Sequence, residues 1–314
     1  MSKYLNVFNT LAEYQAFSAS TEYVQPNVAL VKETNVLYYD YGNNKPQVDM
    51  SDFKVESQET SVGGNKYGKE AITKINYIPN GITSLQGAFG GFTSLVTAPE
   101  IPNSVRSLYS TFNACSSLIN APEIPDSVTN IESTFFGCSS LVNAPVIPYS
   151  VTGMTSTFRN CTSLVNAPVI PSSVTNMSST FNGCSSLVNA PEIPNSVRLM
   201  DYTFYGCSSL VNAPVIPSSV TNIESTFNGC SSLVTAPEIP SGVTSLYYTF
   251  EGCTSLKEVT FLHTTPPTYS YTLRGCSKLE TIYVPDKSVN AYKTATGWLE
   301  FASKIKPLSE KSSE

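Results

Sequence analysis

The stretch that decides the fold is CSSLVNAPVIPSSVTNIESTFNG, residues 207–229, which has near-copies on both sides. Phenylalanine recurs every 23 residues from Phe89 to Phe250. A fixed period of about 20 to 50 residues is typical of a solenoid, because one unit cannot bury its apolar face alone and stacks on the next. The sequence therefore predicts a stack of 23-residue coils. Cysteine keeps the same step, at Cys115, Cys138, Cys161, Cys184, Cys207, Cys230, Cys253 and Cys276.

The apolar positions of the unit predict which side chains face the interior. Pro214 and Pro217 lack a backbone donor, so we expect both at strand ends or corners. A file of asparagines is expected to be buried and to hydrogen-bond the backbone of adjacent coils. The expected interior positions of one unit are Leu210, Ala213, Ile216, Val220, Ile223 and Phe227. The asparagines are Asn143, Asn166, Asn189 and Asn212.

Two segments of the unit, Ile216-Pro-Ser-Ser-Val-Thr-Asn-Ile223 and Phe227-Asn-Gly-Cys-Ser-Ser-Leu233, resemble the BspA-like leucine-rich repeats. The resemblance covers about residues 66–282. It implies an α+β solenoid, a leucine-rich-repeat-like right-handed stack of about nine coils with short parallel strands. The chain departs from the family at Asn212-Ala213-Pro214, where the usual strand residues are missing, so the length of the strands stays open.

Residues 1–63 do not follow the repeat and predict a small β-rich module. Residues 27–32 and 36–41 flank a short polar turn and predict a hairpin. Residues 52–57 alternate polar and apolar side chains and predict a third strand, and residues 10–17 predict two turns of helix. Two roles are open for this module: a cap on the first coil, or an attachment and assembly module. The glycine-rich residues 61–68 are expected to form a joint.

Residues 64–282 are assigned to the solenoid and residues 283–314 to a closing cap and tail. Residues 279–285 predict a last strand, and residues from about 287 to 295 predict an amphipathic helix. This ending resembles the closing cap of BspA-like proteins from Bacteroidales bacteria. Trp298 and Phe301 are expected to cover the final coil, and residues 309–314 to be disordered.

Composition excludes several classes of function. The net charge is −6 and only 13% of residues are charged, whereas nucleic-acid binding needs a basic stripe. No apolar run approaches the roughly 18 to 20 residues that span a bilayer. The first 15 residues lack the apolar core and cleavage site of a signal peptide, so we expect synthesis in the cytosol without general secretion.

Catalytic and metal-binding groups are scarce. Paired Cys-x-x-Cys spacings are absent, so we expect no zinc site, no cofactor and a ladder of buried, reduced thiols. The one histidine, His263, is expected in an exposed loop, and no Ser-His pair is held at repeat register. The glutamates occur at positions that vary between repeats, so they do not predict the paired catalytic carboxylates of a glycosidase. We therefore expect the chain not to be an enzyme.

The variable positions around each Thr-Phe pair predict one surface stripe, because stacking places equivalent residues side by side. Exposed aromatic side chains among small polar ones suit protein or sugar recognition. The alternative is a plain surface stabilised by contacts between neighbouring coils. The predicted binding residues are Tyr109, Phe136, Tyr149, Arg159, Tyr202, Tyr205, Tyr247 and Tyr248.

Three hypotheses of function follow. The first is a fibre or decoration protein of a Bacteroidales phage particle: residues 1–63 dock on other virion proteins, the chain forms homo-oligomers on the particle, and the repeats contact host protein or polysaccharide. Residues 23–41 weakly resemble the leading module of such phage proteins. The second is a BspA-like adhesin of the bacterial cell surface. The third is a glycan hydrolase, against which the missing catalytic groups weigh.

Overall fold

The structure is a computed structural model that describes residues 81–311 together with Ile75 and Ile78, and the backbone of three strands near the N-terminus. The chain forms two compact units, Met1–Val151 and Thr152–Glu314. The predicted boundaries at residues 63 and 282 remain predictions.

The N-terminal strands form one sheet in the order β1-β2-β3. β2 (Asn27–Val31) and β3 (Val36–Asp40) pair antiparallel, which confirms the predicted hairpin. β1 (Leu5–Phe8) pairs parallel with β2 and was not predicted. The helix predicted at residues 10–17, the strand at 52–57 and the joint at 61–68 lie outside the described residues.

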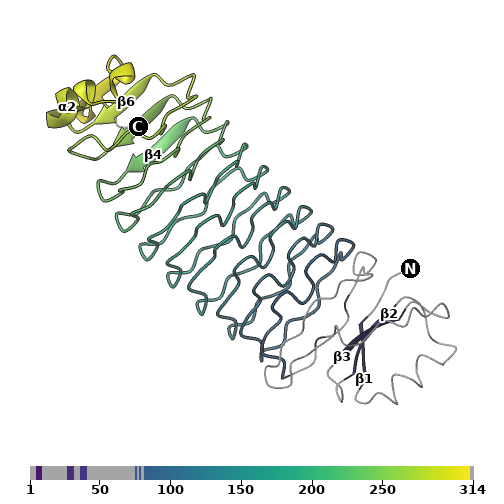
Figure 1. Ribbon diagram of the computed structural model, residues 1–314. Helices are drawn as coiled ribbons and strands as arrows, with labels where there is room; N and C mark the ends of the chain where they lie inside the picture. The colour runs from purple at the N-terminus through teal and green to yellow at the C-terminus, as the bar shows by residue number, and fades with distance from the viewer. Residues whose placement is uncertain are drawn as a thin grey trace. The chain divides into compact units, whose positions relative to one another are not determined.

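Files of identical side chains fill the interior of each unit. The phenylalanine and cysteine files are buried, as the 23-residue period predicts. Neighbouring rings lie nearly parallel: Phe112 and Phe135 have centroids 5.7 Å apart, and Phe204 and Phe227 also 5.7 Å apart. The predicted interior positions are buried in the same way, except that Ala213 is only half-buried. In Figure 1 the coils of the Thr152–Glu314 unit follow one another in chain order from teal to yellow.

Threonine, rather than asparagine, supplies the internal polar ladder. The Thr226 hydroxyl donates to the Met200 carbonyl of the preceding coil at 2.6 Å, and buried threonines at the same repeat position act alike. The prediction that Asn143, Asn166, Asn189 and Asn212 are buried is wrong, since all four are exposed. Their side chains lie on the outside of the coils, where the Asn212 amide donates to Asn189 Oδ1 at 2.9 Å.

Two positions in each coil adopt a left-handed backbone. One lies before the cysteine and is usually glycine, as at Gly206 with φ of +69°. Ala114 and Asn160 replace glycine there and keep positive φ, at 58° and 60°. The other lies two residues before the phenylalanine and is serine in most coils, such as Ser225 with φ of 51°.

Regular strands occur only in the C-terminal coils of the described residues 81–311. There β4 (Thr235–Ile239), β5 (Glu258–Phe261), β6 (Thr281–Val284) and β7 (Ile305–Pro307) form a parallel sheet in this order. In the preceding coils only isolated bridges form, such as Asn189 with Asn212, because the prolines of the Asn-Ala-Pro segment cannot donate to a ladder. The prediction of short parallel strands therefore holds for the end of the array.

The C-terminal cap contains 3₁₀ turns η3 (Asp286–Ser288), η4 (Leu299–Phe301) and η5 (Leu308–Glu310) and the helix α2 (Val289–Thr294). The predicted strand and helix are thus present. Trp298 is buried and packs edge-on against Phe261 of β5, with ring centroids 5.2 Å apart. The predicted disorder is wrong for Ser309 and Glu310, because Lys311 ties this end to the sheet through Glu238.

Candidate functional site

The predicted surface stripe is richest in tyrosine in the Thr152–Glu314 unit. Its residues occupy three repeat positions: the third and second before the phenylalanine, and the one directly after it. We call five of them the tyrosine face, and each is half-buried or exposed. The five are Tyr202, Tyr205, Tyr247, Tyr248 and Tyr271.

Tyr202 and Tyr205 lie together in one coil, with ring centroids 6.0 Å apart. The Tyr202 hydroxyl donates to Glu224 Oε1 of the next coil at 3.0 Å. Partial burial raises the pKa of Tyr202, and the hydrogen bond to the Glu224 carboxylate raises it further. This pKa rise keeps the phenol protonated, so it remains a donor to the carboxylate.

Tyr247, Tyr248 and Tyr271 form the second half of the tyrosine face. The rings of Tyr247 and Tyr248 meet edge to face at 4.2 Å, and Tyr248 stacks on Tyr271 at 5.3 Å. The Arg274 guanidinium lies 5.6 Å from the Tyr271 ring centroid and 3.4 Å from a Glu251 carboxylate oxygen. Aromatic rings and carboxylates of neighbouring coils thus come together as the 23-residue register predicts.

The sequence prediction missed Tyr271 and Arg274. The signal was available: they follow Tyr248 and Glu251 by 23 residues. Leu273 replaces the phenylalanine of this coil, so a count of phenylalanines ends one coil too early.

The other predicted binding residues are not among the five of the tyrosine face. Tyr109 is exposed and Phe136 half-buried in the Met1–Val151 unit, and Arg159 is half-buried in the other unit. Tyr149 is 75% exposed and occupies the turn after Pro148, which is not one of the three stripe positions. The structure therefore does not place Tyr149 with the predicted stripe.

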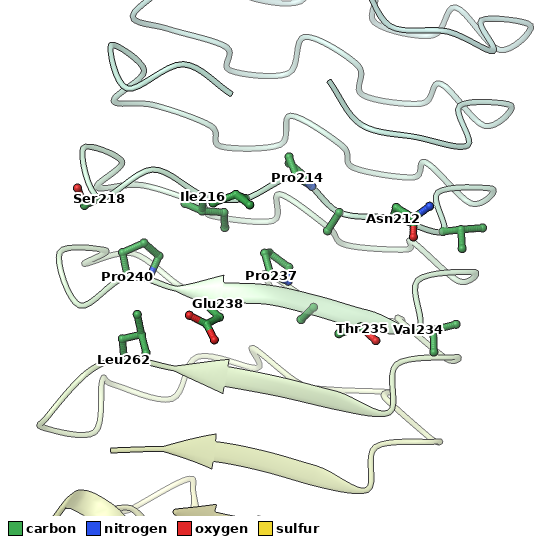
Figure 2. A pocket seen from close by; sticks show the side chains of 14 residues that line it. Asn212, Pro214, Ile216, Ser218, Val234, Thr235, Pro237, Glu238, Pro240 and Leu262 are labelled. Carbon is green, nitrogen blue, oxygen red and sulfur yellow. The ribbon is translucent and has the colours of Figure 1, made fainter. Parts of the chain in front are cut away.

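A groove of about 570 Å³ opens on the Asn-Ala-Pro side of the Thr152–Glu314 unit. Figure 2 shows Asn212, Pro214 and Ile216 on one side of it and β4, with Pro237 and Glu238, on the other. The two segments are bridged at one end through Asn212 and Thr235 and then separate, since Pro214 has no N–H to continue a ladder. The lining is largely apolar, and its carboxylate, Glu238, is held by Lys311 at 3.0 Å.

A smaller groove of about 410 Å³ lies at the same repeat position in the Met1–Val151 unit. It is lined by Glu100, Glu123 and the prolines that flank them. The recurrence of the groove in both units shows that it is a consequence of the proline pattern rather than of one special coil.

The cysteine thiols are buried and unreactive. All eight cysteines are free and buried. The thiol of Cys207 donates to the Phe181 carbonyl at 3.2 Å, and Cys230 makes the same contact with Phe204 at 3.1 Å. Burial raises the pKa of Cys207 well above its ordinary value and that of Cys276 to about 12. A protonated thiol is a poor nucleophile and a poor metal ligand.

The prediction for His263 is wrong, because its side chain is buried rather than exposed. Its Nε2 lies 2.7 Å from the Val243 carbonyl oxygen and donates to it, while Nδ1 has no hydrogen-bond partner within the described residues. The Tyr292 hydroxyl donates to the His263 carbonyl at 3.2 Å. His263 therefore connects the last coils to the cap. Within residues 81–311 no group of three His, Cys, Asp or Glu side chains could hold a metal ion.

The chain matches the family model described as the BspA type leucine rich repeat region, over residues 60–188 and 178–296. The chain belongs to the BspA-type leucine-rich repeat family. Repeats of this family typically occur in non-enzymatic binding proteins. No helix among the described residues is long and apolar enough to cross a bilayer.

Several solved structures of leucine-rich repeat proteins are similar to this BspA-type chain. The protein from Treponema pallidum has 28% identity, covers 51% of this chain and 76% of its own, and gives a TM-score of 0.41. A leucine rich cell surface protein from Faecalibacterium prausnitzii has 22% identity, covers 73% and 81%, and gives 0.29. The protein from Eubacterium ventriosum has 18% identity, covers 76% and 73%, and gives 0.44. No curated protein sequence matches the chain.

Proposed function

We propose that this BspA-type protein is a non-enzymatic binding protein that contacts another macromolecule through the tyrosine face at a bacterial cell surface. The observation that carries the proposal is the group of accessible aromatic rings that includes Tyr202, Tyr248 and Tyr271. These three tyrosines have φ of 55°, 54° and 57°, at the position where most other coils have serine. The left-handed backbone costs any residue with a Cβ roughly 1–2 kcal/mol, and the serines of the other coils have the same cost.

The turn therefore imposes this backbone on every coil, and what distinguishes these three coils is the aromatic side chain. The three tyrosines gather within a few neighbouring coils rather than scattering along the chain. Tyr247 and Tyr271 are 41% and 50% exposed, so both are accessible to a partner. Amphipathic, rigid side chains of this kind dominate the energetics of many interfaces.

The experiment is binding of the labelled full chain to intact Bacteroidales cells and to epithelial cells. We expect saturable binding that falls when Tyr247 and Tyr271 are both changed to serine. The matched control changes Val169 and Val215 to serine, because these valines are 85% and 84% exposed on the Asn-Ala-Pro side of the coils. Equal binding by both double variants would contradict a role for the tyrosine face.

A phage particle is a second setting for the same contact function. The observation that favours it is the sheet β1-β2-β3, which lies outside the repeat and could dock the chain on other virion proteins. In that setting the chain would form homo-oligomers on the particle. Immunogold labelling separates the two: label on the envelope of producing cells supports the cell surface, and label on purified particles supports the virion.

A further inference from the structure

Arg274 shows how the tyrosine face holds a guanidinium group. Its side chain is 62% exposed, yet it lies over the Tyr271 ring at 5.6 Å and beside Glu251 at 3.4 Å. The ring and the carboxylate come from neighbouring coils, since the Gly252 N–H donates to the Arg274 carbonyl at 2.8 Å. A tyrosine ring and a carboxylate of neighbouring coils therefore lie close enough together on this surface to contact one guanidinium group.

Glu224 has similar surroundings without a cation of its own. It lies between two coils that carry tyrosine: the Tyr202 N–H donates to the Glu224 carbonyl, and the Ser225 N–H donates to the Tyr247 carbonyl, both at 2.8 Å. Its Oε1 accepts the Tyr202 hydroxyl. Among the described residues no Lys or Arg forms an ion pair with Glu224.

The charges around Glu224 favour a positively charged partner. Asp201 precedes Glu224 by 23 residues, so two carboxylates occupy equivalent positions in adjacent coils. Like charges at neighbouring positions repel each other. The known partners of both groups are neutral hydroxyls, since Ser178 donates to Asp201 and Tyr202 to Glu224. A bound cation would relieve this repulsion, whereas nucleic acid and anionic polysaccharide would be repelled.

We propose that Glu224, flanked by Tyr202 and Tyr247, binds an arginine side chain from a basic segment of a partner protein. The inference rests on the proposed contact function and specifies its partner. Arginine is preferred to lysine because a planar guanidinium can lie over a tyrosine ring and also pair with a carboxylate, as Arg274 does with Tyr271 and Glu251.

The test is calorimetric titration of the full chain with a blocked Gly-Arg-Gly-Arg-Gly peptide, its lysine and glutamine counterparts, and the neutral oligosaccharide maltohexaose. The variant is Glu224→Gln, which keeps an acceptor for the Tyr202 hydroxyl and removes the charge. The control is Glu192→Gln, an exposed glutamate of the same unit on the Asn-Ala-Pro side. We expect the arginine peptide to bind most tightly, more weakly at high salt, and about threefold to fivefold more weakly to Glu224→Gln only.

Three results would overturn the proposal. They are equal affinity of Glu224→Gln and the unchanged chain for the arginine peptide, equal affinity for the arginine and glutamine peptides, and binding of maltohexaose with no binding of the arginine peptide. In the last case the contact function would stand if the chain still bound cells through the tyrosine face. Loss of cell binding as well would remove both proposals.

Discussion

The Thr152–Glu314 unit holds its coils together in two different ways. In the coil with Pro214 and Pro217, the Asn-Ala-Pro side makes only single bridges, and stacked Phe, Thr and Cys side chains join the coil to its neighbours from inside. In the last coils, β5 and β6 pair in regular parallel register and the backbone itself adds the contact. The comparison shows that proline removes the backbone ladder on the Asn-Ala-Pro side alone. On the Thr-Phe side backbone bonds still join the coils, such as Phe204 N–H to the Thr226 carbonyl at 2.9 Å, and the side-chain ladders add to them.

β4 lies between these two regions and combines both. Its sequence still contains Ala236 and Pro237, yet it pairs with β5, with a register shift between Thr235 and Glu238. On its other side the groove of Figure 2 separates it from the preceding coil. A single proline-free neighbour is thus enough to draw this segment into a strand.

High pH should weaken the side-chain ladders most strongly, because it acts on all eight cysteines at once. Burial raises the pKa of Cys276 from an ordinary 9.0 to about 12, and that of Cys207 also rises. The unfolded chain therefore loses thiol protons at lower pH than the folded chain. This contribution to stability is complete below about pH 9 and declines by about 1.4 kcal/mol per thiol for each pH unit above it.

Thermal unfolding measured from pH 7 upward, together with thiolate absorbance, checks this prediction. Cys276 should ionise before Cys207, because its thiol is nearer to solvent. A melting temperature that stays constant to pH 11 would contradict the pKa assignment. Changing all eight cysteines to alanine or valine provides the control, since the alkaline decline should then become much smaller.

Removal of one stacked ring should have the next largest effect. Phe204→Ala leaves a cavity between Phe181 and Phe227, whose rings lie 5.6 and 5.7 Å from that of Phe204. We expect a loss of about 3–5 kcal/mol in the free energy of unfolding, measured by urea denaturation. Tyr205→Ala, at the exposed next position, should cost much less. Similar losses in both variants would refute the internal role of the ring file.

Thr226→Val tests the polar ladder at nearly constant shape. The hydroxyl donates to the buried Met200 carbonyl at 2.6 Å, and valine would leave this carbonyl without that donor. Because the Thr203 N–H and hydroxyl still donate to this carbonyl, we expect a cost of about 0.5–1.5 kcal/mol in the free energy of unfolding. Thr221→Val is the matched control, because the Thr221 side chain is exposed. Equal stability of the two variants would show that the internal hydroxyls are dispensable.

Pro214→Val tests directly whether proline separates the Asn-Ala-Pro segment from a regular strand such as β5, and it should change stability least. It restores one backbone donor on the Asn-Ala-Pro side and makes this coil more like β5. We expect a change below about 1 kcal/mol, and slower amide hydrogen exchange at Val215 and Ile216 as a ladder forms. Unchanged exchange would mean that proline is not what keeps this segment from pairing.

Much of the fold could be predicted from the period, and much less of the site. Phe227 and Cys230 repeat at a constant step, so their burial follows from stacking alone. Most of the tyrosine face could also be predicted from the 23-residue register, but the hydrogen-bond and ion-pair partners of its side chains could not. Whether Glu224 meets Tyr202 or a cation depends on side-chain rotamers across coils, and the sequence pattern does not contain them.

The spacing of residues along the chain is enough to predict the 23-residue coil, the buried files and the strand and helix of the cap. These features depend on local spacing and on apolar burial, and the same spacing and apolar positions recur in every repeat. The folded coil alone shows that Thr226, rather than Asn212, faces the interior, and that His263 is buried beneath the cap. Threonine and asparagine both offer hydrogen bonds, so their patterns look alike along the chain. Which of them meets a carbonyl and which meets water depends on how the backbone turns within the coil.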